Sequence, residues 1–114
     1  IEQVTATNSI EADLPCLDLQ QQILLPCLID VHTHLDKGHI WERSPNLDST
    51  FDMALSQGNI DREKYWQPED VYRRMEFGLK CSYAHGTQAI RTHIDSSGKQ
   101  ADISLEVFQS LQSA

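Results

Sequence analysis

The segment PCLIDVHTHLDK, residues 26–37, decides the fold that this sequence predicts. In an extended strand, successive side chains point to opposite faces. One face then carries Asp30, His32, His34 and Asp36, and the other carries Ile29, Val31, Thr33 and Leu35. Two imidazoles two residues apart on a strand point the same way and can share one divalent cation. His32 and His34 are therefore candidate metal ligands, although a His-x-His pair alone is a weak signal.

A second segment, TQAIRTHID at residues 87–95, repeats this division of its side chains. Its polar face carries Ala89, Arg91, His93 and Asp95, and its apolar face carries Ile90, Thr92 and Ile94. A helix between the two strands predicts a right-handed crossover and parallel pairing. The apolar faces should then lie against helices, and the polar faces should line an enclosed interior. Histidine, aspartate and arginine are costly to bury unless they are paired or bind a metal.

The helices are predicted from their start and stop signals. Pro68 followed by two acids begins a helix that runs to His85, and Gly86 stands where a C-terminal cap belongs. Residues 101–114 carry apolar side chains at helical spacing and predict a second outer helix. Residues 37–46 predict a loop, and a short helix is expected over residues 51–55. Either the loop contacts a flat, polar small molecule through Lys37, His39, Trp41, Glu42 and Arg43, or it is solvated and Trp41 packs as its anchor.

Composition limits the partners of the chain. The sequence has 114 residues, 39% of them hydrophobic, which suits one small globular domain. The net charge of −8 disfavours binding to nucleic acid or to an anionic membrane surface. No apolar run is long enough to span a membrane, so a cytoplasmic location is expected. Both ends of the sequence suggest a fragment of a longer chain. The three cysteines are spaced as reduced thiols rather than as a disulfide framework.

Residues 25–37 resemble the first-barrel-strand signature of the amidohydrolase superfamily. Within that superfamily the chain is most similar to the cytosine deaminase branch, because Leu35-Asp36-Lys37 follows the histidine pair and residues 91–95 read RTHID. The resemblance covers about residues 15–112 and is specific in these two stretches. Cys27 departs from the pattern, since the family usually has glycine there.

The resemblance implies an α/β fold that is an incomplete (β/α)8 TIM-type barrel. Residues 26–114 would supply its first two βα units. Residues 1–25 would supply strands of a small β-sandwich, because they hold short runs typical of strands at 3–6, 16–19 and 22–25. It implies one divalent metal ion, iron or zinc, held by His32 and His34. The remaining ligands and the proton shuttle would lie on later strands, so no catalytic residue is expected in this stretch. His93, Asp95 and His39 are the candidate substrate-binding residues.

From this resemblance the chain is expected to be part of a metal-dependent amidohydrolase. Such an enzyme would deaminate a cyclic amidine such as cytosine through a metal-activated water. The small-molecule partner would be a nitrogen heterocycle, and the fragment alone would be inactive. Two alternatives stay open: a non-catalytic small α/β interaction module, or an amidohydrolase that acts on a pterin or a triazine. Two barrel strands would leave an exposed edge and an uncovered apolar face. This predicts self-association of the fragment, exchange of elements between copies, or a missing remainder of the chain, with a homo-oligomer of the parent as the alternative.

Overall fold

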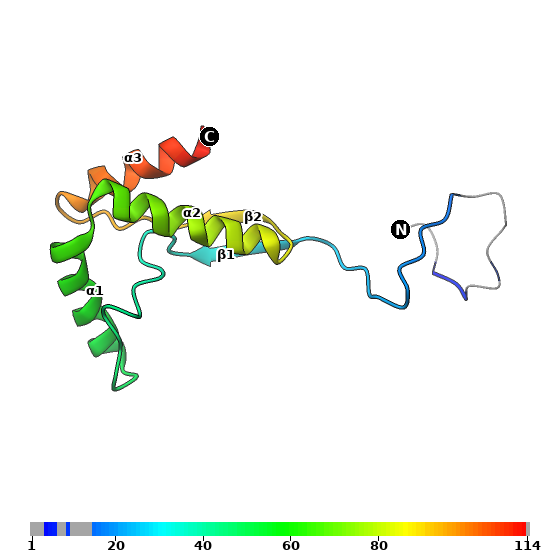
Figure 1. The fold of residues 1–114 in the computed structure, drawn as a ribbon, viewed down its shortest axis with the longest axis horizontal. Coiled ribbons are helices and arrows are strands. Elements are labelled where there is room, and N and C mark those ends of the chain that lie inside the picture. Colours follow the sequence, from blue (N-terminus) through cyan, green and yellow to red (C-terminus); the bar gives the residue numbers. More distant parts are fainter. Residues whose placement is uncertain (1–3, 7–8, 10–14, 114) are drawn as a thin grey trace.

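The computed structural model describes residues 4–6, 9 and 15–113, and it places two parallel strands beside three helices (Figure 1). The elements in chain order are β1 (Leu28–Thr33), α1 (Phe51–Tyr65), α2 (Pro68–Ala84), β2 (Thr87–Thr92) and α3 (Gln100–Gln112). None of the helices within this described part is long and apolar enough to cross a membrane.

The sheet pairs β1 with β2 in parallel, as the helix between them requires. Leu28 lies opposite Thr87 at one end, and Thr33 lies opposite Thr92 at the other. Both predicted strands and their parallel pairing are therefore confirmed. Closure into a barrel remains a prediction, because two strands do not test it.

Helix α2 begins and ends where the sequence predicts. Pro68 stands in its first turn, where its missing N–H needs no partner, and it is followed by acids that suit the positive end of the helix. His85 caps the other end, and its Nδ1 lies 2.7 Å from the carbonyl oxygen of Cys81. Gly86 follows with a φ of 82°, a left-handed conformation that glycine adopts without strain.

Helix α1 is much longer than the predicted short helix over residues 51–55. The Thr50 hydroxyl accepts a hydrogen bond from the backbone N–H of Met53 at 3.1 Å, which caps the first turn. Asp48 supports this cap by accepting a hydrogen bond from Thr50 Oγ1 at 2.8 Å. The helix continues to Tyr65 although few of its residues are apolar, because its inner side is held by ion pairs instead of by a hydrophobic stripe.

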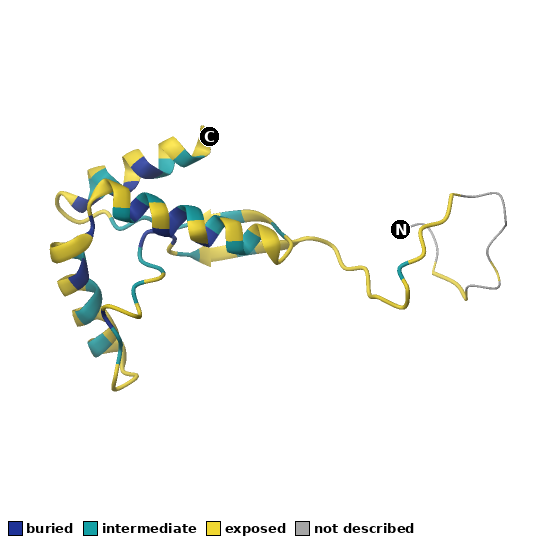
Figure 2. Ribbon diagram, in the orientation of Figure 1, coloured by how far each residue is buried: buried dark blue, intermediate teal, exposed yellow. Residues whose placement is uncertain are grey.

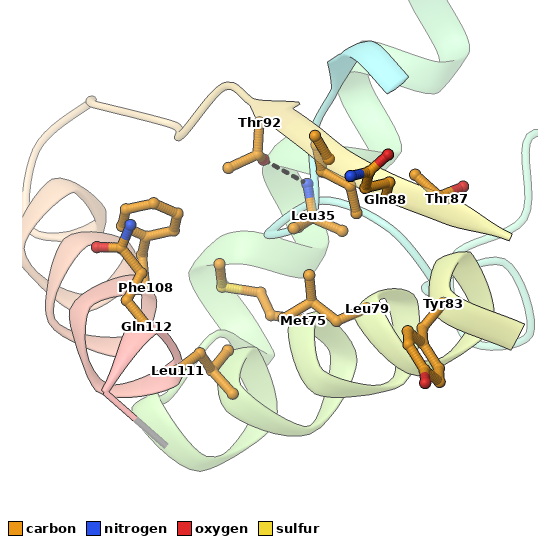
Figure 3. Close-up of a pocket in the computed structure, with 12 residues that line it drawn as sticks. Leu35, Met75, Leu79, Tyr83, Thr87, Gln88, Thr92, Phe108, Leu111 and Gln112 are labelled. Carbon is orange, nitrogen blue, oxygen red and sulfur yellow. Dashed lines mark hydrogen bonds between the residues drawn. The ribbon is translucent and has the colours of Figure 1, made fainter. Parts of the chain in front are cut away.

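The hydrophobic core lies where α2 meets α3 and the segment after β1 (Figure 2). Its buried members are Leu35, Trp66, Val71, Met75 and Val107. Beside this core, a groove of about 400 Å³ opens between β2, α2 and α3, as Figure 3 shows. Helix α2 thus packs against α3 and contacts β2, and the core extends to the strand ends through Leu35.

Two expectations for the N-terminal part do not match the structure. Ile29 and Val31 are 65% and 67% exposed, so the apolar face of β1 is not covered by helices as predicted. The physical reason is that α2 packs against β2 and α3 rather than against β1. Residues 15–27 form no strand and are mostly exposed, so the predicted strands at 16–19 and 22–25 are absent. The expected strand at residues 3–6 lies partly outside the described residues, and the β-sandwich stays a prediction.

A buried carboxylate joins the loop after β1 to helix α1. Asp61 is 0% exposed and accepts hydrogen bonds from Arg43 Nε and Nη2, both at 2.8 Å, from Ser44 Oγ at 2.7 Å and from Trp66 Nε1 at 2.7 Å. Burial by itself raises the pKa of Asp61, but the hydrogen bonds donated by Arg43, Ser44 and Trp66 outweigh it and lower that pKa. The charge is therefore fully compensated in the folded state.

The same arginine extends this contact to helix α2. Arg43 donates from Nη1 to Asp70 Oδ1 at 2.6 Å, and Asp70 Oδ2 accepts from Arg74 Nε at 2.9 Å. Arg74 also donates from Nη1 to the backbone carbonyls of Asp36 and Gly38, the latter at 3.1 Å. A continuous chain of charged groups thus runs from α1 through α2 to the segment that follows β1.

Replacing Asp61 should destabilise the chain strongly. In Asp61→Asn the charge partner of Arg43 is lost and buried donors are left poorly satisfied, so the free energy of unfolding should fall by about 3 kcal/mol. The matched control is Glu63→Gln, which makes the same chemical change at an exposed position of α1 and should stay within about 0.5 kcal/mol of the parent. Urea unfolding followed by circular dichroism measures both.

The contribution of Asp61 to stability depends on pH because the pKa of its carboxyl is lowered in the folded chain. A carboxyl whose pKa is lower folded than unfolded adds stability above the unfolded value of about 3.9, and this contribution is lost as pH falls through the folded value. The parent chain should therefore lose stability below about pH 4 more steeply than Asp61→Asn. Equal slopes in the two proteins would contradict this assignment.

Candidate metal-binding site at the strand ends

Three imidazoles meet where β1 and β2 end. The ring centroids of His32 and His93 are 4.3 Å apart, those of His34 and His93 are 5.3 Å apart, and those of His32 and His34 are 5.5 Å apart. His32 lies within β1, His34 follows it, and His93 follows β2. We call these three residues the histidine cluster. The predicted metal ligands His32 and His34 are thus neighbours, as the strand alternation requires.

His93 joins the cluster through the parallel pairing of the strands. Its backbone N–H donates to the Thr33 carbonyl at 2.7 Å, directly beyond the last residue of each strand. Sequence reasoning places His93 at the mouth of the second strand as a substrate-lining group, without deciding its distance from His32 and His34. The register of the sheet brings the three rings together.

The surroundings of His93 disfavour its protonated form. Partial burial lowers the pKa of His93 first, and the positive charge that His32, His34 and Arg91 can carry lowers it further. His32 and His34 themselves are exposed. His93 is therefore in the neutral form more readily than an isolated histidine is, and neutral imidazole is the form that binds metal.

Asp95, another candidate substrate-binding residue, lies beside a small cavity. Its carboxylate pairs with Lys37 Nζ at 3.1 Å and with Arg62 Nη1 at 2.5 Å. These three side chains border a cavity of about 140 Å³, together with Ile40, Ala54, Leu55, Gly58, Asn59 and Trp66. That volume is smaller than the roughly 300 Å³ at which small-molecule pockets begin, so it suits a substituent rather than a whole heterocycle.

His39 lies apart from the cluster. Its ring packs edge-on against Phe77 of α2 with centroids 4.7 Å apart, and its φ is 62°. Its position gives no support to the predicted substrate-binding role, which stays a prediction. Trp41 is 62% exposed, so its alternative role as a packed anchor is wrong, and Trp66 is the buried indole of this region.

The donor set is suited to a metal but incomplete. Within residues 4–6, 9 and 15–113, no group of three or more histidine, cysteine or acidic side chains is arranged so that it could hold a metal ion. Catalytic zinc sites commonly use three protein ligands and keep a further position open. The two predicted ligands, His32 and His34, can therefore form only part of such a site.

Comparison with known proteins shows that the chain is similar in sequence to a deaminase. The chain is 46% identical over all 114 residues to the pterin deaminase of Rhizobium rhizogenes (strain K84 / ATCC BAA-868). It spans 26% of the length of that curated relative. No protein-family profile matches the chain, and no solved structure matches it either.

The lowered pKa of His93 gives a direct test of the cluster. In the metal-free chain, His93 should titrate below the ordinary histidine value of about 6.5. The stability that neutral His93 contributes to the folded chain is therefore present above that value and is lost as pH falls through the folded pKa of His93. In His32→Ala one repelling charge is removed, so the pKa of His93 should rise toward the ordinary value. Titration of the ring protons by NMR measures both, and a His93 pKa that is unchanged by this substitution would show that the rings are not neighbours.

Proposed function

We propose that this chain is part of a metal-dependent hydrolase that deaminates a nitrogen heterocycle, with a pterin as the favoured substrate class. The observation that carries the proposal is the convergence of His32, His34 and His93 at the ends of two parallel strands. Similarity over the whole chain to a pterin deaminase supports the substrate class. Cytosine remains the alternative within the same chemistry.

One divalent ion, zinc or iron, would be held by His32 and His34. Imidazole nitrogen suits both metals. The lowered pKa of the neighbouring His93 means that a proton competes less for its nitrogen lone pair. When bound, such an ion polarises a water molecule so that hydroxide is available near neutral pH. Further ligands would come from residues outside this chain.

The reaction is a balanced hydrolysis. The water oxygen would form a bond to the amidine carbon that carries the amino group, and the bond from that carbon to the amino nitrogen would break. One proton of the water leaves with the ammonia and the other stays on the product, which carries a carbonyl in place of the amino group. No oxidant or reductant is needed. In this scheme His93 lines the edge of the heterocycle, and Asp95 with its partner Lys37 borders the cavity that takes a ring substituent.

A non-catalytic α/β interaction module is the competing function. It would keep the same sheet and helices, with the histidines as polar surface residues. Metal affinity separates the two, because a module has no need of a cation at the strand ends.

Zinc titration of the 114-residue chain tests the metal assignment. His32→Ala and His34→Ala should each weaken zinc binding by more than about tenfold. Removing a residue that only orients a metal ligand costs at least about tenfold, and removing the ligand itself should cost more. His85→Ala removes an exposed histidine at the far end of α2 and is the matched control, with unchanged affinity. In a protein that carries this chain within a complete barrel, ammonia release from pterin should exceed that from cytosine and should be lost in His32→Ala. Zinc binding that is indifferent to His32 and His34, or release that survives His32→Ala, would overturn the proposal.

We also propose that the 114-residue chain self-associates through the exposed side of β1. Strands with open edges and exposed apolar side chains pair readily with other strands, and Val31 is 67% exposed. Light scattering should give a mass above that of the monomer, and Val31→Lys should shift it toward the monomer. Val4→Lys changes an exposed valine that lies outside the sheet and is the control. A compact, soluble monomer of the parent chain would contradict this expectation.

A further inference from the structure

The pairing of the two strands continues past their ends through side chains. The last backbone contact is the one from His93 N–H to the Thr33 carbonyl. Beyond it, the backbone N–H of Leu35 donates to Thr92 Oγ1 at 3.1 Å, the contact drawn as a dashed line in Figure 3. The backbone N–H of Asp95 donates to Asp36 Oδ2 at 2.7 Å. Two side chains thus accept the hydrogen bonds that a backbone carbonyl accepts in a regular ladder.

These two acceptors lie close in sequence to residues of the histidine cluster. Leu35 and Asp36 directly follow His34, and Thr92 directly precedes His93. A slip of one residue in strand register would turn each side chain to the opposite face. The contacts of Thr92 and Asp36 therefore oppose the slip that would separate the rings of His34 and His93.

Asp36 is buried in an environment that is unfavourable for a carboxylate. It is 0% exposed, its backbone carbonyl accepts a hydrogen bond from Arg74, and its Oδ1 has no hydrogen-bond partner among the described residues. Burying a carboxylate with one oxygen unpaired is unfavourable. An apolar residue would avoid that penalty, but it could not accept the N–H of Asp95.

We infer that Thr92 and Asp36 are positioning residues that fix the register in which His34 and His93 meet. They touch neither metal nor substrate and act through the backbone of the neighbouring strand end. The inference rests on the proposed function for its catalytic meaning, whereas the ring geometry that it explains can be measured without any metal.

The experiment removes the Thr92 hydroxyl while keeping the shape of the side chain. In Thr92→Val, amide hydrogen exchange at Leu35 should accelerate about tenfold, as expected for the loss of one hydrogen bond. Cross-relaxation between the ring protons of His34 and His93 should weaken in NMR spectra, and zinc affinity should fall about tenfold. Thr92→Ser keeps the hydroxyl and should retain all three properties. Thr87→Val makes the same change at the start of β2, away from the cluster, and is the matched control.

Asp36 is tested through its acceptor. Asp36→Asn keeps an amide oxygen for the Asp95 N–H and should largely retain the ring contacts, whereas Asp36→Ala should lose them. If Thr92→Val does not fold, Thr92→Ala and Thr92→Ser differ only by the hydroxyl, and their comparison decides. Unchanged ring contacts and unchanged zinc affinity in the variants without an acceptor would overturn the inference. If the parent chain binds no zinc, the proposed metal site fails, and the exchange and ring-contact measurements still decide the positioning role.

Discussion

The structure depends on a carboxylate that is buried and fully satisfied. Asp61 receives four hydrogen bonds from three side chains, Arg43, Ser44 and Trp66. An isolated buried charge is strongly unfavourable, so this arrangement persists only if all its partners stay in place together. Asp61 itself lies in α1, and its partners come from the loop after β1 and from the residue that follows α1, so one group fixes three segments. The loop is therefore held against the helices although few of its side chains are apolar.

This constraint reaches the candidate site through alternating charges. Arg43 donates hydrogen bonds to both Asp61 and Asp70, and Asp70 also pairs with Arg74. Arg74 in turn donates to backbone carbonyls in the segment that follows His34. Arg74 also lies over the Trp66 ring, with its guanidinium carbon 4.8 Å from the ring centroid. Charged groups that are buried or partly buried are screened less by salt than exposed pairs. The helices outside the sheet can in this way hold the ends of strands that carry the histidines.

Local patterns predicted most of the elements and the central pair of the site. Alternation in residues 26–37 and 87–95 identified both strands, and Pro68 with Gly86 marked the ends of α2. These signals are local, since they depend on strand and helix periodicity and on residues that set one backbone angle. Helix α1 runs well past its predicted end at residue 55 because its polar composition gives little periodic signal, and the cap at Thr50 marks only the start of the helix, which the sequence predicts correctly.

The parts that the sequence could not supply are pairings between distant segments. Arg43 and Asp61 are 18 residues apart, and Asp36 and Asp95 are 59 apart. Nothing in the spacing of charged residues selects one such pair from many. The position of His93 was partly accessible, because parallel pairing places the ends of consecutive strands together. Its ring contacts with His32 and His34 needed the register of the strands, and that register is set partly by Thr92 and Asp36.

The electrostatics of the histidine cluster bear on why a cation suits it. Burial lowers the pKa of His93 most, and the positive charge that His32, His34 and Arg91 can carry lowers it further. A metal ion and a proton compete for the same nitrogen lone pair. With its pKa lowered, His93 is less readily protonated than an isolated histidine, so part of that competition is removed at its ring. Strand register is the feature that brings the three rings close enough for their charges to act on His93.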